Sequence, residues 1–415
     1  MEYPQLSART TPKSRRSEQT STTRRLHTQK GTVTLMDVLE IGYPFISVPP
    51  NTGYGPTEAV ISCVTEELVK AGHRVALWAP NGSSTAAEFF SCGEPTSLQV
   101  TPQQWRTLRD AGSREAYALA YARGVEIIHD HTEFTDYEVP KGHARIPVVR
   151  TIHKPASLPG VVAQYQAMSR AGEALVAISG RQRDLYLEAA ERSGGGPINI
   201  VGVVHNPIDL MSIPFQPVKR ESVLFLGRCD VDKAPDSAIR VARAAGKHLV
   251  LALKVVEYEQ DERNRAYYHQ VVTPLIEAGQ ADGTLTLLGE ISPERKLELL
   301  GEASAVLFTS GGPVGSDNTW EEPFGLVLTE AMAAGTPVLA FNKGSAPEII
   351  AQGVTGWVAD TEAEMTAALA RVGTLDPRAC RAHVQAHFSP TIVAQSYLAY
   401  FERVRAALAP SRASH

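Results

Sequence analysis

The chain has 415 residues, of which 43% are hydrophobic and 20% charged, with a formal net charge of -5. This composition is ordinary for a chain that buries large cores, so it excludes disorder as the main state. Gly and Pro, at 32 and 27 residues, are too few for a collagen-like or low-complexity protein. The acidic balance argues against a protein that binds nucleic acid through overall positive charge.

Four cysteines are scattered through the chain without C-x-x-C spacing, at Cys63, Cys92, Cys229 and Cys380. They provide neither a zinc site of the usual spacing nor a disulfide framework, and they fit a reducing compartment. No apolar run approaches the ~18 residues that a membrane-spanning helix needs. We therefore expect a cytoplasmic protein without integral membrane contact.

Residues 1–32 differ from the rest of the chain. They hold five Arg, two Lys and two Glu, and Ser and Thr supply eleven of the thirty-two positions. Such a segment buries too little apolar area to offset its ordering entropy, so we expect a disordered basic tail. The composition resembles a transit peptide, but we favour a flexible or misassigned start. Met36 lies within the first expected strand, residues 32–41, and a chain starting there would keep most of that strand.

From residue 32 onward, apolar runs alternate with helical patterns. The first strand leads into a loop at 49–58, a helix at 59–71 with its apolar residues on one face, and a strand at 73–79. This order forms a βαβ unit and indicates a parallel sheet. A helix is expected at 103–123. Further strands are expected at 125–129, 146–152, 174–179 and 201–209.

A proline-punctuated stretch at 212–217 separates this series from a second one of the same rhythm. The strands expected in the second series are 222–227, 248–255, 284–288, 305–309 and 337–340. We therefore predict an α/β protein with two Rossmann-like, doubly wound domains facing across a cleft, with ligands at the carboxyl ends of the strands. The expected segments are a tail at 1–32, an N-terminal domain at 33–211, a C-terminal domain at 212–389, and a C-terminal helix and tail at 390–415.

The loop before the first helix contains Gly53, Tyr54 and Gly55, followed by Pro56. Glycines let a backbone approach a ligand closely, and a helix that begins there offers free N–H groups and the positive end of its dipole. The loop can therefore bind phosphate, although an ordinary tight turn explains the same residues equally well. It is not a Walker loop, because no Gly-Lys-Ser/Thr follows.

Two cations follow the first strand of the second series. Gly227 and Arg228 end that strand, and Lys233 lies five residues on. An Arg fork and a Lys point charge together can hold a diphosphate, and a solvated surface pair is the alternative. Asp230 and Asp232 have the Asp-x-Asp spacing that can bind a divalent cation. We interpret them as loop structure because they lie between the two cations.

Two carboxylates, Glu322 and Glu330, stand eight residues apart around the start of a helix. Phe324 and Gly325 place backbone N–H groups at the N-terminus of that helix, and Leu326 follows them. An ordinary helix start explains one of the two glutamates but not the whole arrangement. This is the most specific motif in the chain.

Three histidines follow buried strands, at His129, His131 and His153. A single histidine is more often structural than catalytic. A histidine just past a strand that ends at a cleft is a better candidate for function.

Together these segments resemble glycosyltransferase family 4, which has two Rossmann-like domains in the GT-B architecture. Residues 320–338 resemble the E-x7-E signature of the family, and residues 344–348 and 353–357 resemble its flanks. The glycine loop resembles the family's G-Y-G-G-T-E, and Gly227-Arg228 with Lys233 resembles its G-R…K pair. The resemblance covers about residues 33–400.

The resemblance implies a retaining transfer from a nucleotide diphosphate sugar, with UDP as the first guess and GDP as the second, to a hydroxyl of a small-molecule or saccharide acceptor. In that role Glu330 holds the ribose, Arg228 and Lys233 neutralise the leaving diphosphate, Glu322 binds donor sugar hydroxyls, and His131 lies near the reacting sugar. The other donor-side residues are Gly53, Gly55, Gly227, Phe324, Gly325 and Leu326. His153 and Tyr54 are candidates for the acceptor side. Neither a cofactor nor a metal is expected.

Two positions depart from the family pattern. Pro56 replaces a loop glycine and removes one N–H donor, and Pro207 also stands where the family usually has glycine. Two other functions stay open: a nucleotide-sugar epimerase of the same fold and a non-catalytic nucleotide-sugar-binding protein. Acceptor specificity is expected from residues 80–104 and 132–143.

Overall fold

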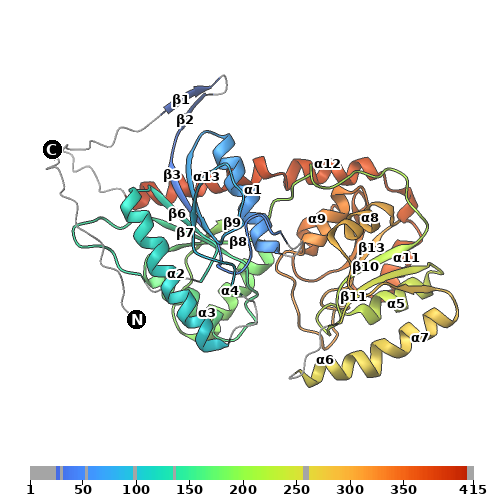
Figure 1. Cartoon of the computed structure of the whole chain (residues 1–415). Helices are drawn as coiled ribbons and strands as arrows, with labels where there is room; N and C mark the ends of the chain where they lie inside the picture. Colours follow the sequence, from blue (N-terminus) through green and yellow to red (C-terminus); the bar gives the residue numbers. More distant parts are fainter. Residues whose placement is uncertain are drawn as a thin grey trace, which may run out of the picture.

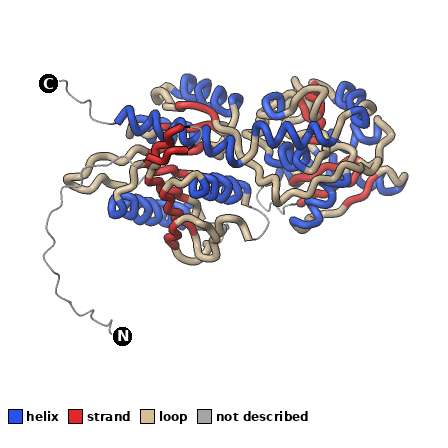
Figure 2. The backbone as a smooth tube through the Cα atoms, turned by 90° about the horizontal axis from the view of Figure 1, so that it is seen from above, coloured by secondary structure: helices blue, strands red, loops and turns tan. Residues whose placement is uncertain are grey.

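The computed structural model describes residues 25–28, 31–51, 55–96, 101–133, 137–255 and 261–408. It contains two parallel sheets, each flanked by helices, in two bodies that lie next to each other (Figure 1). Seen from above, the strands of each body lie between its helices (Figure 2). The predicted fold class, two Rossmann-like α/β domains, is confirmed. Within the described residues, no helix is both long and apolar enough to cross a membrane.

The N-terminal sheet has seven strands in the order β5-β4-β3-β6-β7-β8-β9, and every neighbouring pair is parallel. Its strands are β3 (Asp37–Ile41), β4 (Arg74–Ala79), β5 (Glu88–Ser91), β6 (Ile127–Asp130), β7 (Val148–Ile152), β8 (Ala174–Ala177) and β9 (Ile200–Val203). Its helices are α1 (Pro56–Lys70), α2 (Pro102–Arg123), α3 (Val161–Arg170) and α4 (Gly180–Ser193).

The C-terminal sheet has six strands in the order β12-β11-β10-β13-β14-β15, again all parallel. Its strands are β10 (Val223–Arg228), β11 (Leu249–Lys254), β12 (Leu285–Leu287), β13 (Val306–Phe308), β14 (Val338–Phe341) and β15 (Gly356–Ala359). The helices are α5 (Pro235–Ala244), α6 (Glu262–Tyr267), a π-helical turn (Tyr268–Val272), α7 (Thr273–Ala281), α8 (Pro293–Glu302), α9 (Leu326–Ala333), α10 (Ala346–Ile349), α11 (Glu362–Leu369), a 3-10 turn (Val372–Thr374) and α12 (Pro377–His387).

The strand order reverses at one point in each sheet. From β3 the chain builds outward through β4 and β5, and then returns to place β6 on the other side of β3. It does the same around β10, with β11 and β12 on one side and β13 on the other. In doubly wound sheets, ligands bind at the carboxyl ends of the strands beside such a switch point. The ends of β3 and β6, and of β10 and β13, are therefore where a site is expected.

The last helix, α13 (Pro390–Leu408), follows α12 and returns to the N-terminal domain, where it packs against α1 and β7. Its buried side chains include Val393, Tyr397 and Phe401, which recur every four residues and so share one face of the helix. They join a core cluster that contains Val64 of α1 and Val149 of β7. The last described helix thus lies on the N-terminal domain (Figure 1).

The single strand predicted at residues 32–41 is wrong. The structure has β2 (Gly31–Thr34), which pairs antiparallel with β1 (Arg25–Thr28) in a hairpin separate from the two sheets, and then β3. The strand breaks at the buried Met36, whose backbone bonds to residues at the start of β4 and not to β1. Its N–H donates to His73 Nδ1 (3.1 Å), and its carbonyl accepts from Arg74 N–H (3.0 Å). Residues 25–28, 31 and 32 of the expected tail lie in this hairpin, and residues 1–24, 29 and 30 lie outside the described residues.

Two strands of the parallel sheets were not predicted, β5 and β15. Each lies at an edge of its sheet and pairs with one neighbour only. An edge strand with one solvent-facing side carries a weak hydrophobic pattern, and the side chains of β5 are mostly exposed. Both sheets therefore extend one strand further than their patterns indicate.

Candidate active site

The E-x7-E motif forms the loop that leads into α9. Gly325 is the N-cap of this helix, with φ of 75°, and a Cβ added there would lie 2.9 Å from Phe308 Cζ, so glycine is required. The Phe324 side chain is buried in the core, and its carbonyl accepts from Ser345 Oγ (2.6 Å). The side chain of Phe324 therefore fixes the loop, and α9 begins at Leu326 with the positive end of its dipole toward that loop.

Glu322 is the centre of a polar cluster in front of α9. It forms an ion pair with Lys233, and the same carboxylate oxygen accepts from Ser310 Oγ (3.0 Å) and Trp320 Nε1 (3.2 Å). Burial acts to raise the pKa of Glu322, but the Lys233 ammonium and these hydrogen bonds outweigh it and lower the pKa. Lys233 Nζ also lies 5.3 Å from the centre of the Trp320 ring. The motif and the cation of the second series are thus brought together.

Arg228 ends β10 and pairs with Asp230, with Nη2 and Oδ2 3.0 Å apart. The other Asp230 oxygen accepts from the Lys233 backbone N–H (2.9 Å), so this buried carboxylate holds the turn between the two cations. The turn passes close to Gly227, where an added Cβ would meet the Phe225 ring at 3.3 Å. Asp230 has the structural role that its position suggested.

A cavity of about 170 Å³ lies between β10, β13 and α9. Lys233, Ser310 and Glu322 supply its polar groups, and Leu326 and Phe308 are among its apolar walls. It lies at the carboxyl side of the switch point, where the topology places a ligand.

Glu330 lies in the second turn of α9 and pairs with Lys296 of α8, with Nζ and Oε1 2.6 Å apart. Lys296 belongs to no recognised sequence motif, and its pairing with Glu330 was not predicted. A ribose that binds Glu330 would share its carboxylate with Lys296, and the role of Glu330 stays a prediction.

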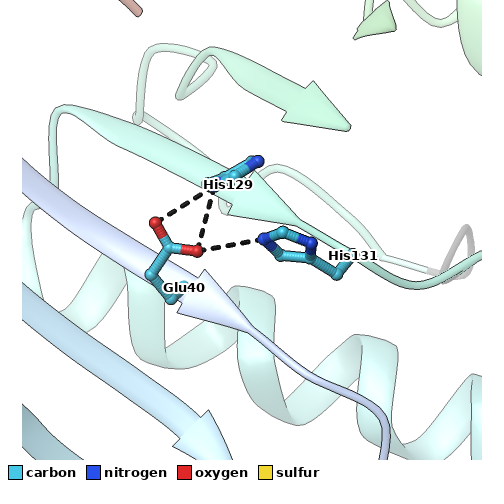
Figure 3. A group of neighbouring side chains, drawn as sticks. All are labelled: Glu40, His129 and His131. Carbon is cyan, nitrogen blue, oxygen red and sulfur yellow. Dashed lines mark hydrogen bonds and ion pairs between the residues drawn. The ribbon is translucent and has the colours of Figure 1, made fainter. Parts of the chain in front are cut away.

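The histidines lie at the carboxyl ends of β6 and β7. His131 is 1% exposed, and both of its ring nitrogens have protein partners: Nε2 lies 3.2 Å from Glu40 Oε2, and Nδ1 lies 3.0 Å from His153 Nε2. His129 Nδ1 contacts the same carboxylate at 3.0 Å, because Glu40 of β3 is the cross-strand neighbour of His129 (Figure 3). A direct hydrogen bond from His131 to a sugar stays a prediction, because both ring nitrogens of His131 already have protein partners; His153 is half-buried.

Burial dominates the protonation of this group. It lowers the pKa of each of His129, His131 and His153 to about 3, and it raises the pKa of Glu40. The histidines are therefore neutral at physiological pH. Glu40 was missed at the sequence level, although a glutamate within an otherwise apolar strand was a visible signal.

The glycine loop is described from Gly55 onward, and Gly53 and Tyr54 lie outside the described residues. Gly55 is the N-cap of α1, and an added Cβ would lie 2.8 Å from Pro50 Cβ. Pro56 occupies the first turn of α1, where the N–H has no partner within the helix, so proline costs the helix little there.

Two carboxylates of the C-terminal domain reach the N-terminus of α4 in the other domain. Glu348 of α10 accepts from the backbone N–H groups of Gly180 and Arg181, both at 2.7 Å, and Glu321 pairs with Arg181 Nη2 at 3.1 Å. His205 Nε2 also lies 3.3 Å from Glu348. We call this group the interdomain contact. It joins the residue directly before Glu322 to the N-terminal domain, and no sequence motif indicated Arg181.

Comparisons with known proteins agree with this arrangement. The family model of glycosyl transferases group 1 matches residues 210–378, and that of glycosyltransferase family 4 matches residues 57–212. Alpha-maltose-1-phosphate synthase of Mycolicibacterium smegmatis is 26% identical over 275 residues, 60% of this chain and 67% of that protein. D-inositol 3-phosphate glycosyltransferase of the same organism is 26% identical over 279 residues, 60% of this chain and 59% of that protein. The matched part is thus under two thirds of the second relative's length.

Among solved structures, AviGT4, a glycosyltransferase involved in avilamycin A biosynthesis, shares the fold with a TM-score of 0.62 and 23% identity, covering 89% of this chain and 98% of that one. The two family models divide at the proline-rich stretch between the two sheets, so each domain matches its own half of one architecture. The chain therefore belongs to the glycosyltransferases of family 4 type with the GT-B fold.

Proposed function

We propose that this glycosyltransferase moves a sugar from a nucleoside diphosphate sugar to a hydroxyl of a small-molecule or saccharide acceptor, with retention of anomeric configuration and without a metal ion. The observation that carries the proposal is that Arg228 ends β10, and that Lys233 in the following turn lines the same cavity as Gly325 and Leu326 at the N-terminus of α9.

The charges fit a leaving diphosphate. Arg228 and Lys233 are paired with the carboxylates of Asp230 and Glu322, so both cations are held in place before a ligand arrives. Negative charge grows on the diphosphate as the glycosidic bond breaks, and fixed cations with a helix N-terminus stabilise that charge. Glu322, kept ionised by Lys233, is then available to accept hydrogen bonds from sugar hydroxyls.

Two cations and a helix dipole can replace the divalent cation that many transferases use with a diphosphate. Asp230, which could have been a metal ligand, instead holds the turn between the cations. We assign retention as the family resemblance implies, with the acceptor attacking from the side that the diphosphate leaves.

Two relatives support the proposed acceptor class. One is named a synthase of alpha-maltose-1-phosphate and the other a glycosyltransferase of D-inositol 3-phosphate, and both names point to small hydroxyl compounds. We extend this class to the present chain and assign the acceptor to the N-terminal domain, near His153.

The experiment has two steps. UDP-sugars and GDP-sugars are screened for thermal stabilisation, because a ligand that binds only the folded chain raises its melting temperature. The best donor is then incubated with candidate acceptors, and acceptor-dependent release of nucleoside diphosphate is expected. Epimerised donor without an acceptor would support an epimerase instead, and binding without any turnover would support a binding protein.

A further inference from the structure

Glu321 and Glu322 are adjacent in the chain, but their side chains bind different parts of the molecule. Glu322 lines the cavity of the C-terminal domain and forms its ion pair there with Lys233. Glu321 pairs with Arg181 of α4 in the N-terminal domain, with Oε1 and Nη2 3.1 Å apart. A single peptide bond therefore separates a residue of the candidate active site from a contact between the two domains.

The second oxygen of Glu321 binds the segment that supports this loop. It accepts a hydrogen bond from the backbone N–H of Gly344. Gly344 lies directly against Glu322, because a Cβ added to Gly344 would lie 2.5 Å from Glu322 N and 2.6 Å from Glu322 O. Ser345 N–H donates to the Glu322 carbonyl at 3.0 Å, and its hydroxyl donates to the Phe324 carbonyl at 2.6 Å. The backbone around Glu322 is thus held by the same segment to which Glu321 is bound.

The N-terminus of α4 is also bound to the C-terminal domain through its backbone. The Glu348 carboxylate accepts from the N–H groups of Gly180 and Arg181, both at 2.7 Å. Gly180 approaches so closely that an added Cβ would lie 3.2 Å from Glu348 Oε2. Arg181 therefore has two separable links across the domains, a backbone link to Glu348 and a side-chain link to Glu321. Only the side-chain link leads to the residue directly before Glu322.

We propose, on the basis of the transferase function above, that Arg181 is a positioning residue that sets the place of Glu322 at the cavity through Glu321. The residues that line the cavity all belong to the C-terminal domain, so Arg181 acts on the transferred sugar only through this pair. The arginine comes from the N-terminal domain, to which the acceptor is assigned. Binding of the donor sugar in one domain therefore depends on contact with the other.

The exposure of the pair distinguishes a positioning role from a stabilising one. The side chains of Arg181 and Glu321 are 37% and 24% exposed, and Arg181 also pairs with Glu188 of its own helix at 3.3 Å. Ion pairs this exposed contribute little to stability. A displacement of about 1 Å at a reacting group, in contrast, can lower a rate by about 10²-fold. We therefore expect loss of the pair to affect the reaction more than the stability of the chain.

The first test needs no turnover, because it detects the position of Glu322 directly. Trp320 Nε1–H donates to the Glu322 carboxylate, so the ¹⁵N–¹H signal of this indole reports where Glu322 lies. The signal is assigned in the full chain with Trp320→Phe. Arg181→Ala keeps the backbone link and should shift the Trp320 signal. Arg183→Ala is the matched control and should leave the signal unchanged, because Arg183 lies in the same helix and pairs with Asp184. An unchanged signal in Arg181→Ala would refute the proposal.

The second test is kinetic. Arg181→Ala should lower kcat by roughly tenfold, less than the loss of a group that contacts the developing charge. The affinity for the nucleoside diphosphate of the best donor, UDP or GDP, should stay unchanged, because the pair acts on the sugar. Glu321→Ala should have the same effect, and the double variant should be no slower than either single one, because the two residues act as one unit. Arg181→Lys, which keeps the charge, should recover most of kcat.

The kinetic outcomes also separate this proposal from the transferase function. Wild-type kcat in Arg181→Ala, or additive losses in the double variant with Glu321→Ala, would overturn the positioning role while the transferase function stands. Absence of turnover in the parent chain would refute the transferase function. The Trp320 signal would then still decide whether Arg181 sets the place of Glu322.

Discussion

The two domains shift the pKa values of their buried carboxyl groups in opposite directions. We call the groups around Glu322 the charged half of the site and those around Glu40 the neutral half. In the C-terminal domain, Glu322 and Glu348 have lowered pKa values, because Lys233 and several hydrogen-bond donors outweigh burial. In the N-terminal domain, burial dominates and raises the pKa values of Glu40 and Glu58. Burial alone therefore does not decide the state of a carboxyl group in this protein. The C-terminal half holds its carboxylates ionised beside cations and hydrogen-bond donors, whereas burial in the N-terminal half favours the protonated form of its carboxyl groups and the neutral form of its histidines.

The largest effect is expected from removing a fixed charge. Lys233→Ala and Arg228→Ala should each lower kcat by roughly 10²–10³-fold, the usual effect of losing one electrostatic donor to a developing charge. Steady-state kinetics with the best donor and acceptor measures it. Lys70→Ala is the control, because Lys70 is an exposed lysine that pairs with Glu67 within α1. Turnover equal to that of the parent in either site variant would show that the replaced cation is a surface charge without a role in catalysis.

Glu58 tests whether burial keeps a carboxyl group of the N-terminal domain protonated. Glu58 is 5% exposed, and burial raises its pKa from 4.5 to about 7, so the folded chain binds a proton there that the unfolded chain has already lost. Stability from this group is complete below about pH 4.5 and is lost as the pH rises to about 7. Glu58→Gln should therefore gain about 3 kcal/mol of unfolding free energy over the parent between pH 4 and pH 8. Denaturant unfolding at both values measures this gain, and an equal difference at the two would show that Glu58 stays ionised.

Glu330 tests the nucleotide side of the charged half. Glu330→Ala should weaken nucleoside diphosphate binding roughly tenfold or more, since hydrogen bonds to a charged group contribute roughly 1.5–3 kcal/mol. Calorimetric titration measures the affinity, with Glu298→Ala as the control on the neighbouring α8, where that glutamate pairs with Arg295 on the surface. Unchanged affinity would show that Glu330 does not bind the ribose.

The smallest effect concerns the interdomain contact, which joins the two halves. Glu348→Ala removes the acceptor for two N–H groups at the start of α4, and should cost about 1 kcal/mol of stability, like the loss of an N-cap. Thermal unfolding measures it against Glu191→Ala, a glutamate whose side chain is exposed in α4. A melting temperature equal to that of the control would show that the contact does not hold the domains together.

Local patterns predicted most of the fold, because each parallel strand is a continuous apolar run followed by a helix pattern. The charged half of the site was also visible, since Glu322, Phe324 and Gly325 lie within one short motif. The neutral half was not, because the contact between Glu40 and His129 depends on the register of β3 against β6, across 89 residues of sequence. The pairing of Arg181 with Glu321 spans 140 residues and two domains, and no local pattern contains it.

The central claim is a retaining, metal-independent sugar transfer, and the anomeric configuration of the product tests it most directly. The transfer reaction is run with a donor of known configuration in the presence of excess EDTA, and the anomeric proton coupling of the product is measured by NMR. We predict that the product keeps the configuration of the donor and forms at the rate seen without EDTA. A product of inverted configuration, or a reaction stopped by EDTA, would contradict the account.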